Sequence, residues 1–124
     1  MNIPKNLKYT KDHEWVLIED GVATIGITDY AQNELGDIVY VELPEVGKLV
    51  TKGDAVSTIE AVKTVADVYS PLSGEVNEVN ETLADTAEII NKDPYGEGWI
   101  FKLKISNKDE INDLLTAEDY KKLL

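Results

Sequence analysis

Short runs rich in β-branched and aromatic residues, in which apolar and polar positions often alternate, recur along most of the chain. Such runs, bounded by Gly, Pro, Asn, Asp or Ser, are typical of β-strands. With turns every 8–12 residues or so, they predict a mainly β fold, a small sandwich or flattened barrel with minor helices. The expected strands are Val22–Ile27, residues 38–44 ending at Pro44, Ala55–Val62, Thr64–Tyr69, a short strand after a turn at Ser73 and Gly74, and residues 99–105; residues 88–91 are a further short apolar run.

Helical signals are confined to two segments. In "TDYAQNELGD", Thr28 or Asp29 can cap a helix of about two turns, and Gln32 can complete a capping box from Asp29. Gly36 can end that helix.

The second helical segment is the tail, residues 107–124. It has two cap-like starts and one apolar face, so we expect it to pack on the sheet and to carry no chemistry. The starts are Ser106 with Asp109 and Thr116 with Asp119, and the face is Ile111, Leu114 and Leu115.

The length and charge limit the classes of function. A chain of 124 residues predicts one domain, 1–124. The net charge is −12, and every base is a lysine, which argues against nucleic acid and favours partners with basic docking faces. No apolar run approaches the roughly 18–20 residues that a membrane span needs, and the N-terminus lacks signal or transit patterns. We therefore expect a soluble protein of the cytoplasm, or of the mitochondrial matrix if the chain is a processed form.

Few residues are available for catalysis or metal binding. The chain has no cysteine, which excludes disulfides and thiolate chemistry, and its single histidine, His13, excludes a two-histidine zinc motif. No phosphate-binding glycine loop is present either. We expect neither catalytic residues nor a metal site.

One lysine stands alone in an acidic region. From Gly53 to Asn91 there are eight acidic residues, and Lys63 is the only base. It lies between two predicted strands, at the tip "AVKT" of a hairpin; because this tip lacks Gly, Asn and Asp, it predicts a type I turn with ordinary φ angles. Val62 is an apolar residue at an exposed tip, which is unusual. An exposed lysine amine is protonated at neutral pH and is a poor nucleophile, so Lys63 is better suited to be acylated by another enzyme.

Several blocks of sequence resemble the glycine cleavage system H-protein family over nearly the whole chain. They are "YTKDHEW", "ATIGITDYAQNELGDIVYVELPEVG", "KGDAVSTIEAVKTVADVYSPLSGEVNEVNE" and "NKDPYGEGWIFKLKIS". The resemblance implies a barrel-sandwich hybrid fold in which Lys63 is lipoylated and acts as a swinging arm in glycine catabolism and one-carbon metabolism. The chain would then be a carrier rather than an enzyme, and a monomer.

The resemblance also implies partners and site residues. The clients would be a pyridoxal-phosphate-dependent glycine decarboxylase, a tetrahydrofolate-dependent aminomethyltransferase and dihydrolipoyl dehydrogenase, together with lipoylating enzymes. The arm would carry the aminomethyl group of glycine between them. Matching positions are Glu60, Gly47 and Val62 for recognition during lipoylation, and Glu14, Asp67, Asp12 and Thr64 for a cleft where the loaded arm docks.

One position departs from the family pattern, and two alternatives stay open. Ala61 replaces the serine that the family commonly has two residues before the modified lysine, which could slow lipoylation. Val62 and Thr64 replace the methionines of biotin carriers and so argue against biotin. The alternatives are a lipoyl donor that relays lipoate to other domains and an acidic interaction module whose Lys63 is never modified.

Overall fold

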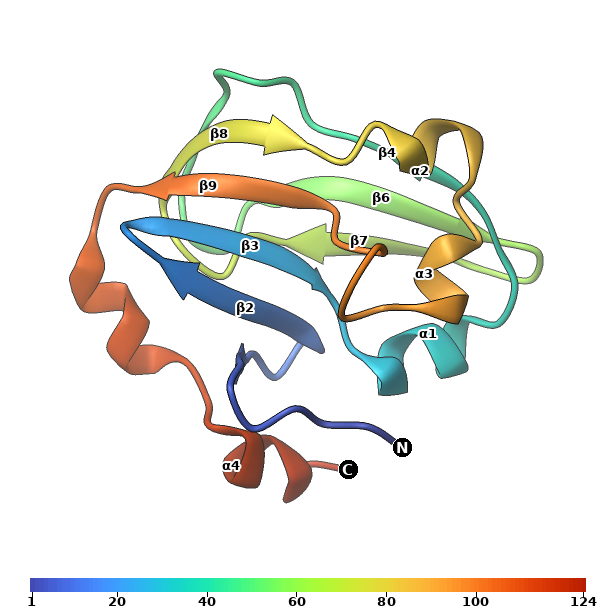
Figure 1. Ribbon diagram of the computed structural model, residues 1–124, viewed down its shortest axis with the longest axis horizontal. Helices are drawn as coiled ribbons and strands as arrows, with labels where there is room; N and C mark the ends of the chain where they lie inside the picture. Colours follow the sequence, from blue (N-terminus) through green and yellow to red (C-terminus); the bar gives the residue numbers. More distant parts are fainter.

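Two antiparallel sheets make up most of the computed structural model, which describes residues 1–124 (Figure 1). The six-stranded sheet has the order β1-β2-β3-β9-β8-β5, and the three-stranded sheet has the order β4-β6-β7. The two sheets are not closed into one barrel by hydrogen bonds. The strands are β1 (Lys8–Tyr9), β2 (Glu14–Glu19), β3 (Val22–Ile27), β4 (Ile38–Glu42), β5 (Leu49–Val50), β6 (Ala55–Ala61), β7 (Val65–Tyr69), β8 (Gly74–Val79) and β9 (Phe101–Ile105).

The core lies between the two sheets. Ile25 of β3 and Phe101 of β9 come from the first sheet, Ile59 of β6 and Val68 of β7 from the second, and all four belong to one cluster of buried apolar residues. Each side chain of this size contributes on the order of 1.5–3 kcal/mol when it leaves water. The prediction of a mainly β fold with a flattened two-sheet core is confirmed.

The helices are short. They are α1 (Asp29–Leu35), α2 (Thr82–Asp85), α3 (Ile89–Lys92), α4 (Ala117–Lys121) and a 3₁₀ helix, η1 (Lys108–Asp113). None of them is long and apolar enough to cross a membrane.

Helix α1 begins as predicted but not with a capping box. Thr28 is the N-cap, its Oγ1 accepting a hydrogen bond from the backbone N–H of Ala31, and Gly36 ends the helix with φ of 77°. The amide of Gln32 donates to the Asp29 side chain at 2.8 Å, and its oxygen accepts from the Asn91 side chain at 3.0 Å instead of from a backbone N–H. The box cannot form because the backbone N–H of Asp29 donates to the hydroxyl of Tyr95 at 3.0 Å.

The short apolar run at 88–91, for which the sequence predicted no type of element, lies mostly in α3, a helical turn that buries Ile90. Two other local predictions need correction. Gly74 begins β8 rather than forming a turn. In the tail, the cap of η1 is Asn107, whose side chain accepts from the backbone N–H of Asp109, and not Ser106.

The tail packs on the outer edge of the six-stranded sheet. Thr116 caps α4 as predicted, its Oγ1 accepting from Asp119 N–H at 3.2 Å. Tyr120 of α4 stacks on Tyr9 of β1 with the ring centroids 4.8 Å apart. These contacts belong to a second, smaller apolar cluster, and they place α4 beside both ends of the chain in Figure 1.

The N-terminal hairpin positions one wall of the site. Strands β2 and β3 are joined at Asp20 and Gly21, which have φ angles of 50° and 79°. Positive φ at both residues is the signature of the mirror-image turn that suits a twisted hairpin. The resulting register sets Glu14, the first residue of β2, opposite Ile27.

Candidate functional site

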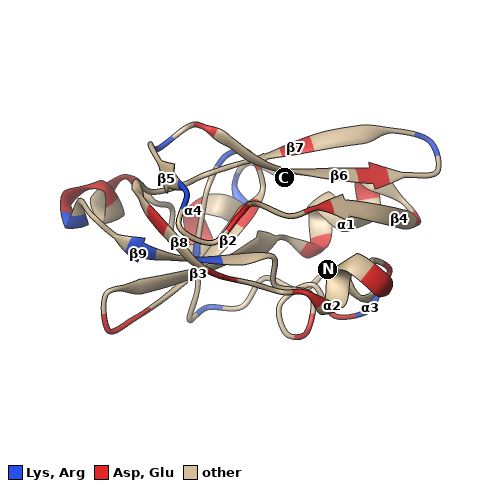
Figure 2. Cartoon of the chain, turned by 90° about the horizontal axis from the view of Figure 1, so that it is seen from above, with Lys and Arg blue, Asp and Glu red and all other residues tan.

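Lys63 lies at the tip of the β6–β7 hairpin. Ala61 N–H donates to Thr64 O at 2.8 Å across the tip, and Val62 N–H donates to Asp37 O at 3.0 Å. Neither Val62 nor Lys63 has a positive φ, which confirms the predicted ordinary turn geometry. The hairpin extends beyond the sheets at the right of Figures 1 and 2, and in Figure 2 its tip is basic while acidic segments lie on the strands behind it. Three ion pairs occur in the protein, and none involves Lys63, whose exposed side chain makes no hydrogen bond.

The tip continues into an apolar and acidic outer face of the three-stranded sheet. Val62 and Val65 are 69% and 60% exposed. Glu60 is exposed on β6, where it is paired with Tyr40 of β4 on one side and Val65 of β7 on the other. The structure therefore groups Glu60 and Val62 beside Lys63, on a surface that is open to another protein.

Gly47 lies in the turn between β4 and β5, beyond the end of the three-stranded sheet that is opposite Lys63. Its φ is 96°, so it occupies a conformation that favours glycine, and its N–H donates to Val76 O at 2.7 Å. Glu42 of β4 is paired with Thr58 of β6, which is five residues before Lys63. Because the two strands are antiparallel, the chain after Glu42 runs away from Lys63, and Gly47 lies five residues further on. The structure does not bring Gly47 together with Lys63 and Glu60, so one recognition surface that includes all three would have to span the length of the sheet.

A cavity of about 200 Å³ opens between the start of β2, α1 and the β6–β7 pair. We call it the carboxylate cleft. Its apolar lining includes Ile27, Ile59 and Val68, and no lysine or arginine lines it. The polar side chains that line it are Asp12, His13, Glu14, Tyr30, Glu34 and Asp67.

Three of the four residues predicted for the arm-docking cleft meet in this cavity. Asp12 and Asp67 are exposed at its surface, and Glu14 is buried. Thr64 is not part of the lining and lies at the exposed tip, where its carbonyl accepts the bond from Ala61. Glu34, which the sequence did not indicate, adds a fourth carboxylate from α1.

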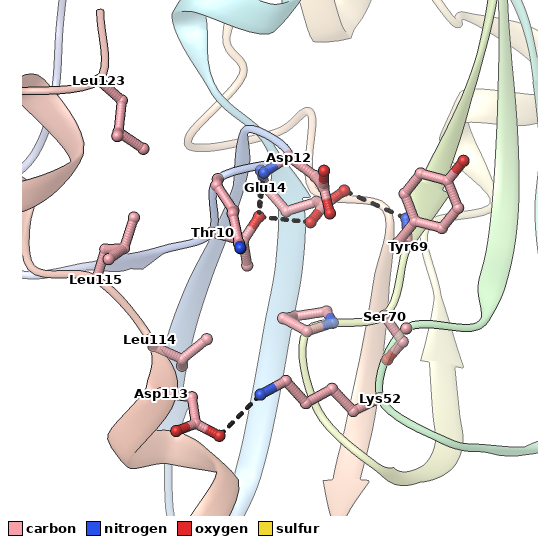
Figure 3. A pocket seen from close by; sticks show the side chains of 13 residues that line it. Thr10, Asp12, Glu14, Lys52, Tyr69, Ser70, Asp113, Leu114, Leu115 and Leu123 are labelled. Atoms are coloured by element: carbon pink, nitrogen blue, oxygen red, sulfur yellow. Dashed lines mark hydrogen bonds and ion pairs between the residues drawn. The ribbon is translucent and has the colours of Figure 1, made fainter.

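The carboxylate of Glu14 is held on both oxygens. Oε1 accepts from the Thr10 hydroxyl at 2.6 Å, and Oε2 accepts from Tyr69 N–H at 3.2 Å (Figure 3). Only 2% of Glu14 is exposed, and this burial raises the pKa of its carboxyl to about 7 against the opposing effect of the two hydrogen bonds. Glu14 therefore changes protonation near neutral pH while it links the turn before β2 to the end of β7.

His13 forms the inner wall of the cleft through a network that sequence reasoning missed. Its Nδ1 lies 2.7 Å from the hydroxyl of Tyr120, which lies 2.7 Å from Thr28 Oγ1, and its ring packs against Tyr30 at 4.6 Å. Burial lowers the pKa of His13, although Asp12 and Glu34 act in the opposite direction. The helix-capping pattern pointed to Thr28, but no local pattern could place Tyr120, 107 residues from His13.

A larger cavity, about 400 Å³, lies on the other side of Glu14. Lys52 Nζ pairs with Asp113 Oδ2 across it at 2.8 Å, and the tail contributes Leu114, Leu115 and Leu123 (Figure 3). We call it the Lys52 cavity. No group of three or more His, Asp or Glu side chains in the protein is arranged to hold a metal ion.

The sequence of this chain is similar to those of known proteins. A family model described as "Glycine cleavage H-protein" matches residues 7–124. The chain is 61% identical over 116 residues to the glycine cleavage system H protein of Thermotoga maritima, covering 94% of each chain. It is 56% identical over 124 residues to the protein of the same name from Thermus thermophilus, covering 100% of this chain and 97% of the relative.

A solved structure shares the fold. It is the crystal structure of a glycine cleavage system H protein from Mycobacterium marinum, with a TM-score of 0.87 and 40% sequence identity. The similarity covers 97% of both chains.

Proposed function

This chain belongs to the glycine cleavage H-protein family, and we propose that it is a lipoyl-bearing shuttle whose attachment site is Lys63. The observation that carries the proposal is the exposed lysine without an internal partner, at a turn fixed by backbone bonds from Ala61 and Val62. Lipoate on this amine would supply the dithiolane that accepts the aminomethyl group of glycine and the electrons of the reaction.

The residues around the tip suit this group. A lysine that is free of ion pairs can be acylated without breaking a native contact, and a modifying enzyme can approach Glu60 and Val62 on the same exposed face. Because the chain has no cysteine, no protein thiol can exchange with the dithiolane.

We propose that the carboxylate cleft holds the ammonium end of the loaded arm. Asp67 lies in β7, four residues after Lys63, which corresponds to about 13 Å if the chain between them is extended. A lysine that carries an eight-carbon acyl chain spans about 15 Å at standard bond lengths, so the cleft lies within its reach. Along this strand the Lys52 cavity is first lined by Tyr69, about 20 Å from Lys63, although Asp12 and Glu14 line both cavities.

The carboxylates would act on the proton of the bound amine. Asp12 and Asp67 at the mouth attract a cation, and a cation near Glu14 favours the ionised form of this buried carboxyl. Together they would keep the amine nitrogen protonated, and a protonated nitrogen has no lone pair with which to expel a neighbouring sulfur.

The proposal extends to partners and context. A carrier of this kind is a substrate of enzymes rather than an enzyme, and its clients would be the decarboxylase, the aminomethyltransferase, dihydrolipoyl dehydrogenase and the lipoylating enzymes. We also propose that residues 1–124 act as one lipoyl-carrier domain in the cytoplasm. The shared core of the two sheets supports the single domain, and the bacterial relatives support the compartment.

Intact-mass measurement tests the attachment site. The protein is purified from cells with a working lipoylation pathway, beside Lys63→Arg and the control Lys48→Arg, which changes another exposed lysine. We expect a lipoyl mass increment in the wild type and in Lys48→Arg, and none in Lys63→Arg. If the wild type carries no increment, the alternative of an unmodified acidic interaction module is favoured, and an increment that persists in Lys63→Arg would assign the site elsewhere.

A further inference from the structure

His13 is the only residue lining the carboxylate cleft that could become a cation, because the lining includes no lysine or arginine. Several carboxylates surround it: Asp12 is its neighbour in the turn before β2, Glu34 comes from α1, and Glu14 and Asp67 line the same cavity. A charged imidazolium here would be an internal competitor for any cation that the cleft receives.

The hydroxyl hydrogens behind His13 can be placed from the partners available. Thr28 Oγ1 lies 3.2 Å from the N–H of Ala31, which can only donate, and 2.7 Å from the hydroxyl of Tyr120. Because Thr28 is 0% exposed, the only acceptor for its own hydroxyl hydrogen is Tyr120. Tyr120 must then turn its hydrogen toward His13 Nδ1, 2.7 Å away, and Nδ1 must accept it without a proton of its own.

We infer that Tyr120 is a positioning residue for the carboxylate cleft, which holds His13 uncharged with its one ring proton on Nε2. The purpose that we assign to Tyr120 rests on the proposed cation-binding role of the cleft, whereas the hydrogen-bond geometry does not depend on it. Protonating Nδ1 would reverse the His13–Tyr120 hydrogen bond and leave one of the two buried hydroxyl hydrogens, that of Tyr120 or that of Thr28, without an acceptor.

The backbone makes this arrangement rigid. His13 has a φ of 69°, and its N–H donates to Thr10 O at 3.2 Å while its carbonyl accepts from Thr28 N–H at 3.0 Å. Tyr120 is 0% exposed and stacked on Tyr9, so its hydroxyl cannot swing away. The C-terminal helix therefore determines the state of His13, so that the cleft offers a neutral imidazole beside its four carboxyl groups and no fixed positive charge.

Nuclear magnetic resonance can test the inference without lipoate, since His13 is the only histidine of the chain and its ring nitrogens need no assignment. Two-bond proton–nitrogen spectra across pH 4.5–8.5 report its tautomer and its titration. In the wild type we expect the Nε2–H tautomer and titration below the ordinary range of histidine. In Tyr120→Phe, we expect titration at a clearly higher pH and a mixture of tautomers.

Two further variants keep the test decisive. Tyr9→Phe is the matched control, because it removes another buried tyrosine hydroxyl, one that donates to Pro4 O at 2.6 Å, and it should leave His13 unchanged. Thr28→Val keeps the Tyr120 ring and removes the hydroxyl that orients it, together with the cap of α1, so it should raise the titration pH of His13 even if Tyr120→Phe fails to fold. A wild-type Nδ1–H tautomer, or the same titration in wild type and Thr28→Val, would overturn the inference.

Binding of methylammonium separates the inference from the proposed function. At a pH between the two titration midpoints of His13, where the variant carries more charge on this ring, we expect Tyr120→Phe to bind methylammonium several-fold more weakly than the wild type. Well above both midpoints, the two proteins should bind it equally well. Equal binding at the lower pH by a variant with charged His13 would refute the purpose assigned to Tyr120. If neither protein binds methylammonium in the cleft, the cation-binding function fails, while the His13 spectra still decide whether Tyr120 holds the imidazole.

Discussion

The hairpin tip and the floor of the cleft are opposite in construction, although both belong to the proposed site. At the tip, the side chains of Val62 and Lys63 are exposed and have no hydrogen-bond partner within the chain. At the floor, Glu14 and His13 are held in hydrogen bonds, His13 by Tyr120 behind it, and the protein has no buried side-chain polar atom without a partner. The tip is available to other proteins because nothing inside the protein uses it, whereas the floor is fixed so that it presents one arrangement to a ligand.

This difference predicts that substitutions at the floor change stability and its pH dependence, while substitutions of the exposed side chains at the tip change only binding or modification. The largest effect should come from Glu14. Its pKa of about 7 in the folded state lies above its ordinary value near 4.5, so its protonated form favours the fold. The stability that it contributes is present below pH 4.5, is lost as the pH rises through 4.5–7, and changes no further above that range.

Replacing Glu14 by Gln should remove this pH dependence. The amide can still donate to Thr10 Oγ1 and accept from Tyr69 N–H after a flip, so the fold is preserved. Relative to the wild type, the free energy of unfolding of Glu14→Gln should rise by up to roughly 3 kcal/mol between pH 4.5 and pH 8. Urea unfolding at four pH values measures the difference. Glu60→Gln, at an exposed position on β6, is the control and should stay within about 0.5 kcal/mol of the wild type.

A pH-independent difference between Glu14→Gln and the wild type would contradict this account. It would mean that Glu14 stays ionised in the fold, and that its two hydrogen bonds outweigh burial. The cleft would then offer a permanent negative charge rather than one that appears near neutral pH.

The next effect should come from Thr28, which has two bonds where an ordinary cap has one. Thr28→Val removes the cap of α1 and the partner of the Tyr120 hydroxyl, and should lower the free energy of unfolding by about 2 kcal/mol. Thr116→Val removes an exposed cap of α4 that has no second partner, and should cost about 1 kcal/mol. Urea midpoints of the two variants measure the extra bond, and equal losses would show that the Thr28–Tyr120 contact adds no stability.

The difference between the tip and the cleft also explains which parts of the structure could be predicted from the sequence. Strand β3 has the predicted bounds, Val22–Ile27, and the β6–β7 hairpin differs from prediction by one residue at Val62 and one at Thr64. In these elements the pattern is local: alternating residues, a stop at Ser70–Pro71, and a lone lysine between two runs. The tip can therefore be predicted from consecutive residues.

The cleft cannot be predicted in that way, because residues from distant segments of the chain meet in it. Tyr120 contacts Thr28 across 92 positions and His13 across 107. One signal was present but left unused, since Asp20-Gly21 is a hairpin signal that would have predicted β2 and set Glu14 near Ile27. The burial of Glu14 and the raised pKa of its carboxyl have no counterpart in the local sequence, because both depend on Thr10 and on the end of β7.

Asp67 falls between the two regions and gives the smallest expected effect on stability. It lines the cleft, yet it is exposed, and its one side-chain contact is a 3.2 Å bond from Thr58 Oγ1. By exposure it resembles the tip, so Asp67→Asn should change the free energy of unfolding by less than about 0.5 kcal/mol. By position it belongs to the cleft, so the same change should weaken methylammonium binding about fivefold at low salt, the loss expected for one partly screened charge.

The control for Asp67→Asn lies in the same row of the sheet. Thr58 of β6 is paired with Asp67 on one side and with Glu42 on the other, and Glu42 is exposed but does not line the cleft. Glu42→Gln removes the same charge and should leave methylammonium binding almost unchanged. In 1 M salt, where charges are screened beyond about 3 Å, Asp67→Asn and the wild type should bind alike. If Glu42→Gln weakens binding as much as Asp67→Asn, the cation responds to the overall charge of −12 rather than to the cleft.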